Sequence, residues 1–210
     1  MSVIIRRYEY IRLVSDEGES EAVKLALFNL RRDLMRVLEC RINAAVLAPQ
    51  VTILVGTIGI CPEVEKKADI GLLKDENGVY RKEAFLIQEK DGELLIAGTD
   101  RRGTIFGIYD FCEWLGVSPW YFFADVPVRR REIAVIEDGY CKVDYPSVEY
   151  RGIFINDEEE LENWAQRYMG EETIGVKTYE KIFELLLRLK LNYIWPAMHV
   201  NSFNLKQENG

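Results

Sequence analysis

Hydrophobic positions in the first part of the chain predict strands that alternate with a long helix. Residues Val3–Val14 are rich in β-branched and aromatic side chains, which favours one or two strands. Between Glu19 and Arg41 apolar residues return every three or four positions, which predicts a helix with one buried stripe. The run Val51–Val55 is typical of a central strand. The stripe consists of Val23, Leu27, Leu30, Leu34 and Leu38.

A hairpin follows further along the chain. Phe85–Lys90 and Glu93–Ala97 flank the pair Asp91-Gly92, which is a strong signal for a two-residue turn. A hairpin requires antiparallel strands, so we expect a mixed sheet. Glu132–Ile136 is predicted to be the last strand of this first region.

A second helix is predicted from about Gly103 to Leu115. Thr99-Asp100 precedes it as a capping pair, and Gly116 stands where a left-handed residue ends a helix. The segment Gly98–Thr104 lacks both common phosphate-loop patterns, and a helix cap explains its composition.

The pattern changes after Tyr145-Pro146, which marks a predicted boundary between residues 1–145 and 146–210. Tyr150–Ile155 is a predicted strand, Thr178–Leu189 an amphipathic helix and Leu191–Trp195 a second strand. A strand, a helix and a strand in this order form a βαβ unit, whose strands are normally parallel. The predicted class is therefore α/β: a small mixed-sheet domain with two helices, then the first βαβ unit of a truncated (β/α)₈ barrel.

An unfinished barrel would leave two strand edges without partners, and such edges associate. We therefore expect the chain to form homo-oligomers through Tyr150–Ile155 and Leu191–Trp195.

Composition narrows the function classes. The 210 residues carry a formal net charge of −8, which argues against a nucleic-acid partner. No apolar run approaches the length of a membrane span, and no signal peptide is recognised, so we expect a cytoplasmic protein unless a leader has been removed. The four cysteines form no C-x-x-C pair, and we expect neither a metal nor a cofactor.

Two strand ends carry candidate chemistry. Asn156, Asp157 and Glu158 follow the first predicted strand, and in (β/α)₈ enzymes active-site residues lie at the carboxyl ends of the strands. Carboxylates there can hydrogen-bond sugar hydroxyls or transfer protons, so Asp157 is the candidate acid or base. Glu159 and Glu160 are interpreted as the charged start of a loop or helix.

The second strand ends in a segment suited to a sugar. Its tryptophan can stack on a pyranose face, while histidine and asparagine supply hydrogen bonds. The candidate binding residues are Trp195, Met198, His199, Asn201 and Asn204.

These motifs resemble those of known enzymes. Leu95–Asp110 and Gly116–Trp120 resemble the small α/β domain that precedes the catalytic barrel in glycoside hydrolase families 20, 67 and 84. Tyr150–Glu158, Leu191–Met198 and Ala124–Val128 resemble the start of the barrel in glycoside hydrolase family 115. This second resemblance covers nearly the whole chain.

The resemblance implies an enzyme that releases glucuronic acid, or its 4-O-methyl form, from xylan side chains by inverting hydrolysis. It places the acid and the base mostly on later barrel strands, and Asn156, Asp157, Glu158 and the segment 195–204 in the sugar pocket. His199 stands where many relatives carry an aromatic residue. Neither loop offers an arginine for the uronate, and the chain alone is expected to be inactive. An exo-hexosaminidase with the same accessory domain, or a non-catalytic carbohydrate-binding or interaction module, are the alternatives.

Overall fold

A computed structural model describes residues 1–42, 49–157 and 159–198 of the chain. It contains two compact units, Met1–Ser147 and Val148–Gly210.

A six-stranded mixed sheet forms the centre of the first unit. Its strand order is β3-β2-β4-β6-β5-β8, in which β3, β2, β4 and β6 run parallel and β5 is antiparallel to both of its neighbours. This arrangement confirms the predicted mixed α/β class. It also confirms that the run Val51–Val55 forms a central strand of the sheet. The strands are β2 (Tyr10–Val14), β3 (Arg41–Ile42), β4 (Val51–Thr57), β5 (Phe85–Lys90), β6 (Glu93–Gly98) and β8 (Cys141–Asp144).

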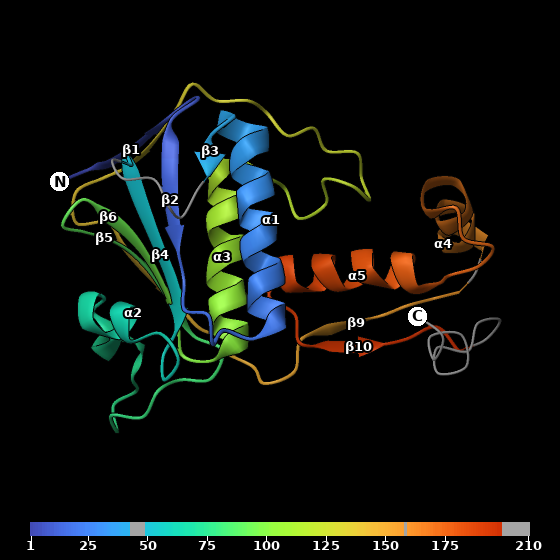
Figure 1. The fold of residues 1–210 in the computed structure, drawn as a ribbon. Helices are drawn as coiled ribbons and strands as arrows, with labels where there is room; N and C mark the ends of the chain where they lie inside the picture. Colours follow the sequence, from blue (N-terminus) through green and yellow to red (C-terminus); the bar gives the residue numbers. More distant parts are fainter. Residues whose placement is uncertain (43–48, 158, 199–210) are drawn as a thin grey trace. The chain divides into compact units, whose positions relative to one another are not determined.

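Helices cover both faces of this sheet. Helices α1 (Glu21–Leu38) and α3 (Arg101–Leu115) lie side by side on one face, and α2 (Pro62–Lys67) lies on the other (Figure 1). Successive side chains of a strand point to opposite faces of the sheet, so each strand contributes apolar residues to the cores on both faces. Leu54 and Leu95 pack with α2 and with the 3₁₀ turn η1 (Ile70–Leu73), whereas Ile96 packs against α3.

Helix α1 is shorter than the predicted span Glu19–Arg41. Ser20 caps its start by accepting a hydrogen bond from the Val23 amide, and Glu39 ends it in the left-handed conformation. Glu19 therefore lies before the helix, where its buried carboxylate accepts hydrogen bonds from the amide and the hydroxyl of Thr57. Arg41 lies after it, in β3.

The prediction that Glu132–Ile136 is the last strand of this region is wrong. The strand β7 (Ile133–Ile136) pairs antiparallel with β1 (Val3–Arg6) in a separate two-stranded sheet. The later strand β8 then pairs with β5 at the edge of the main sheet. The sequence analysis also missed the short helical elements α2 and η1. The missed elements α2, η1 and β8 are each six residues long or shorter.

The predicted hairpin and second helix are confirmed. Asp91 and Gly92 both have positive φ angles, of 54° and 79°, as a two-residue hairpin turn requires. Helix α3 begins after Asp100, whose side chain caps it, and ends at Gly116 with a φ of 105°.

The second unit contains the predicted βαβ arrangement. Strands β9 (Gly152–Phe154) and β10 (Tyr193–Trp195) are parallel, and helix α5 (Val176–Arg188) lies between them in the chain. Both strands are shorter than predicted. A short helix α4 (Glu159–Trp164) and a π-helical turn η2 (Ala165–Met169) precede α5, so Glu159 and Glu160 open a helix.

Among the described residues, no helix combines the length and the apolar composition needed to cross a membrane.

Candidate functional site

The register of β9 and β10 places an aromatic pair at their carboxyl ends. Trp195 is the partner of Phe154 in this register, and their ring centroids are 6.0 Å apart at an interplanar angle of 69°. Trp195 is 49% exposed and Phe154 is 57% exposed. An exposed edge-to-face pair at this position offers an apolar platform of the kind on which a sugar ring can stack.

The loop after β10 extends this platform. The indole Nε1 of Trp195 donates a hydrogen bond of 3.4 Å to the sulfur of Met198, and Met198 is exposed. This contact holds the tryptophan and the methionine together, and their role in binding a sugar stays a prediction. We call Phe154, Asn156, Trp195 and Met198 the strand-end surface.

The two polar residues after β9 differ in exposure. Asn156 is exposed, whereas Asp157 is only 2% exposed. Exposure alternates from Phe154 through Ile155 to Asp157, as expected for extended backbone. Asn156 is therefore open to a ligand, while the carboxylate of Asp157 lies in the interior of this unit. Its role in proton transfer stays a prediction.

Sequence reasoning missed a buried tyrosine in this unit. Tyr179 lies on α5, is 2% exposed, and accepts a hydrogen bond of 3.1 Å from the backbone amide of Ala197. Burial raises the pKa of its hydroxyl, the Ala197 amide lowers it, and the negative charge of Asp157 raises it further, so that the net pKa is raised. The sequence did contain a sign of this role, because Tyr179 lies on the apolar face of the predicted helix. A tyrosine buried on such a face needs a hydrogen-bond partner for its hydroxyl.

Four predicted site residues lie outside the described part of the chain. They are Glu158, His199, Asn201 and Asn204.

The segment Gly98–Thr104 acts as the predicted helix cap. One carboxylate oxygen of Asp100 accepts the amide of Gly103 at 2.8 Å, and the other accepts the amide of Glu83 at 2.8 Å. Both oxygens are thus used in holding α3 to the chain before β5.

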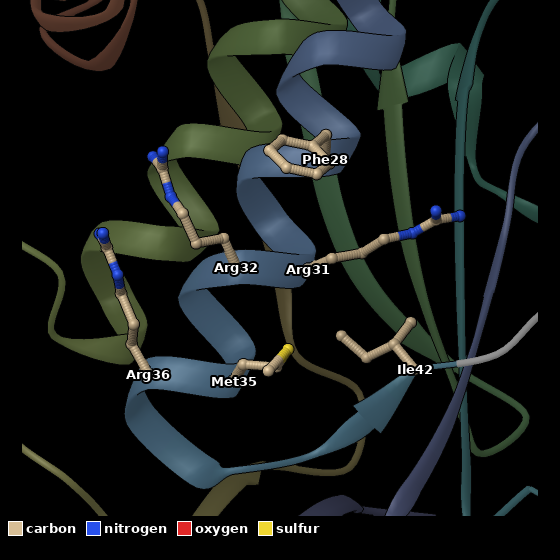
Figure 2. Close-up of a pocket in the computed structure, with 6 residues that line it drawn as sticks. All are labelled: Phe28, Arg31, Arg32, Met35, Arg36 and Ile42. Atoms are coloured by element: carbon tan, nitrogen blue, oxygen red, sulfur yellow. The ribbon is translucent and has the colours of Figure 1, made fainter.

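A groove of about 500 Å³ lies along α1 in the first unit. Figure 2 shows that Met35 and Ile42 point toward each other, while Arg31 points away from Arg32 and Arg36. Arg32 donates a hydrogen bond of 2.9 Å to the hydroxyl of Tyr121, which engages its guanidinium. The arginines that line the groove therefore do not converge on one point. Its lining residues are Phe28, Arg31, Arg32, Met35, Arg36 and Ile42.

Within the described ranges, no group of three or more His, Cys, Asp or Glu side chains is placed to hold a metal ion.

Comparison with known proteins identifies the family. The model of glycosyl hydrolase family 115 matches residues 143–210, which includes both strand ends. The structure of a family GH115 4-O-methyl-α-glucuronidase, BtGH115A, with specificity for decorated arabinogalactans, is 38% identical over 94% of this chain, with a TM-score of 0.81. The chain belongs to glycosyl hydrolase family 115. It spans 26% of the length of BtGH115A.

More distant structures share the fold of this family-115 chain. A GH138 enzyme targeting pectin rhamnogalacturonan II is 14% identical over 89% of this chain and 18% of its own, with a TM-score of 0.52. A β-hexosaminidase of Streptomyces plicatus is 14% identical over 93% of this chain and 31% of its own, also with a TM-score of 0.52. At these identities the likeness concerns the fold alone. No curated protein sequence matches the chain.

The resemblance predicted from the sequence is therefore confirmed.

Proposed function

We propose that the protein containing this chain releases glucuronic acid, or its 4-O-methyl form, from the side chains of a plant polysaccharide by inverting hydrolysis. The observation that carries this proposal is the 38% identity to a 4-O-methyl-α-glucuronidase over 94% of the chain. The βαβ unit of residues 148–198 then supplies the first two strands of a (β/α)₈ barrel, whose active site lies at the carboxyl ends of its strands.

The strand-end surface contributes substrate binding in this proposal. Trp195 and Phe154 supply the apolar platform for a sugar ring, and Asn156 supplies an exposed amide for sugar hydroxyls. Inversion needs two carboxyl groups roughly 6.5–9.5 Å apart with a water between them. These groups, and the cation that neutralises the uronate, are contributed by later strands, so residues 1–210 alone are inactive.

Two polysaccharides compete as the substrate. Glucuronoxylan is the substrate implied by the sequence resemblance, whereas the specificity of BtGH115A for decorated arabinogalactans favours an arabinogalactan that carries glucuronic acid.

The test is an assay of the full-length protein with glucuronoxylan, glucuronic-acid-decorated arabinogalactan and an N-acetylhexosaminide. Glucuronic acid, or its 4-O-methyl form, released from either polysaccharide supports the proposal, and the faster substrate identifies the backbone. Hydrolysis of the N-acetylhexosaminide alone would support an exo-hexosaminidase instead, and the absence of all three activities would support a non-catalytic module.

A further inference from the structure

Helix α1 carries a second set of apolar residues on its exposed side. Phe28 and Met35 are 59% and 60% exposed, although the helix also buries a full apolar stripe. They are seven residues apart, which is two helical turns or about 10 Å along the axis, so they lie on one face. Ile42 of β3 points toward Met35 within the groove of about 500 Å³ (Figure 2). Phe28, Met35 and Ile42 therefore form the apolar part of this groove.

Arginines border this apolar part on both sides. Figure 2 shows that Arg31 extends to one side of the helix, and Arg32 and Arg36 extend to the other. The guanidinium carbons of Arg32 and Arg36 lie 5.7 and 4.8 Å from the ring centroid of Tyr121, which holds that side in place. Arg31 is exposed, and its guanidinium forms no hydrogen bond or ion pair with another residue in the described part of the chain. Arg31 is therefore ready to bind an anion.

The carboxylates along this part of the helix are buried or paired. Asp33 is fully buried, and one of its oxygens lies 3.6 Å from Nη1 of Arg36. Glu39 pairs with Arg7 at 2.8 Å and with Arg130 at 3.2 Å. These two are the acidic residues of the sequence between positions 23 and 42. The exposed side of α1 thus presents positive charge, although the chain as a whole is acidic.

Separated cations around an apolar surface suit a polymer better than a single small anion. A phosphate needs donors that converge, and these arginines diverge. A sugar chain has apolar faces that stack on aromatic and aliphatic side chains, and a uronate carboxylate pairs with a guanidinium group. Nucleic acid is charged at every residue and is disfavoured by the net charge of −8, whereas a decorated polysaccharide is charged only at its uronates.

We propose that the exposed side of α1 is a second carbohydrate-binding site, which binds a further uronate-bearing segment of the polysaccharide. Phe28 and Met35 stack on sugar rings, and Arg31 pairs with a carboxylate. This inference rests on the proposed function, because the substrate named there is anionic. All of the residues that form the site belong to the first unit, so the site is separate from the strand-end surface.

Arginine footprinting of the full-length protein tests the site directly. Phenylglyoxal modifies accessible guanidinium groups, and mass spectrometry of the digested protein reports each position. Glucuronoxylan or glucuronic-acid-decorated arabinogalactan, at a concentration well above its Kd, should slow the modification of Arg31 by about threefold or more. Arg101, exposed at the start of α3, is the matched control and should react unchanged. The same polymers after reduction of their carboxyl groups should protect neither residue.

Three footprinting results would overturn the inference. The first is a reactivity of Arg31 that neither polymer changes. The second is equal protection of Arg31 and Arg101, which would show unspecific binding. The third is an Arg31 that is already unreactive in the free full-length protein, because another part of that protein, or a second copy of it, would then cover the groove.

Substitutions give a matching affinity measurement on the full-length protein. Arg31→Gln should weaken binding of the protecting polymer about two- to fivefold, as expected for the loss of one exposed ion pair. Adding Phe28→Ala should bring the loss to about tenfold, because the stacking surface is removed as well. Arg101→Gln removes the same charge elsewhere and should bind like the parent. Isothermal titration in the cold, before glucuronic acid is released, measures these affinities, and parental affinity in the double variant would overturn the inference.

The second site and the proposed function fail separately. Release of glucuronic acid without protection of Arg31 would retain the proposed function and overturn the second site. Protection of Arg31 without any release of glucuronic acid would retain the binding site and refute the proposed activity.

Discussion

The side chain of Asn192 accepts the backbone amide of Arg151 at 3.0 Å, immediately before the two parallel strands begin. The backbone of the same pair is also joined, because the Asn192 amide donates to the Arg151 carbonyl at 2.8 Å. The side-chain amide of Asn192 further donates to the carbonyl of Glu149 at 2.7 Å. Asn192 therefore sets the start of the β9–β10 register, and with it the pairing of Phe154 and Trp195 at the other end.

Replacement of this asparagine should weaken the second unit. Asn192→Ala removes two hydrogen bonds to backbone groups, and we expect the free energy of unfolding to fall by about 2–3 kcal/mol. Urea denaturation of the chain measures this change. The matched control is Asn163→Ala, on the exposed side of α4, which should lie within about 0.5 kcal/mol of the parent. Equal stability of the two variants would contradict this role of Asn192.

Close packing of α3 against the chain before β5 gives a second prediction. A Cβ atom on Gly103 would overlap the carbonyl oxygen of Ala84, which is backbone and cannot turn away. Gly103→Ala should therefore destabilise the first unit by about 3 kcal/mol. Gly71→Ala is the control, because nothing lies within 4 Å of the added atom, and it should be neutral or slightly stabilising. Thermal unfolding of both variants checks the difference, and a neutral Gly103→Ala would refute the packing.

Acid stability should depend on Glu89. The amide of Gly139 donates to its carboxylate at 2.8 Å and that of Gly92 at 2.9 Å, and these bonds outweigh burial and lower its pKa from the ordinary 4.5. Because the folded pKa is the lower one, this stabilisation is present above about pH 4.5 and is lost as the pH falls through the folded pKa.

The matching variant is Glu89→Gln, which keeps only one acceptor oxygen. We expect it to be less stable than the parent at pH 7, and the difference to shrink when unfolding is repeated near pH 3. A difference that stays constant over this range would show that the carboxylate charge contributes nothing.

The long helices were predictable from the sequence, and the short elements were not. Periodicity predicted α1, α3 and α5, since each buries an apolar stripe over at least 13 residues. It missed α2 and β8, because six and four residues give too few repeats of a pattern. The pairing of β1 with β7 joins distant segments, and neither segment contains information about its partner.

The residues of the candidate site were predictable from the sequence, but their exposure was not. The composition of the strand ends indicated Asn156, Asp157 and Trp195 as a group. Which of them is exposed depends on where the strand ends and on the helix that packs beside it. The burial of Asp157 and of Tyr179 therefore emerged only from the structure.

Self-association is a further prediction for residues 1–210. The outer edges of the two-stranded β9–β10 sheet have no partner strand among the described residues, and Phe154, Tyr193 and Trp195 are exposed on it. Such edges and aromatic surfaces associate. Sedimentation velocity should show oligomers that increase with concentration, and Tyr193→Lys should reduce them. A monomer at all concentrations would contradict the prediction.

We propose that the full-length protein is an inverting glucuronidase, and time-resolved proton NMR of that protein tests this proposal. With a polysaccharide that carries α-linked glucuronic acid or its 4-O-methyl form, the β-anomer of the free acid should appear first and then mutarotate to the equilibrium mixture. First appearance of the α-anomer would contradict inversion, and the absence of any free glucuronic acid would contradict the activity itself.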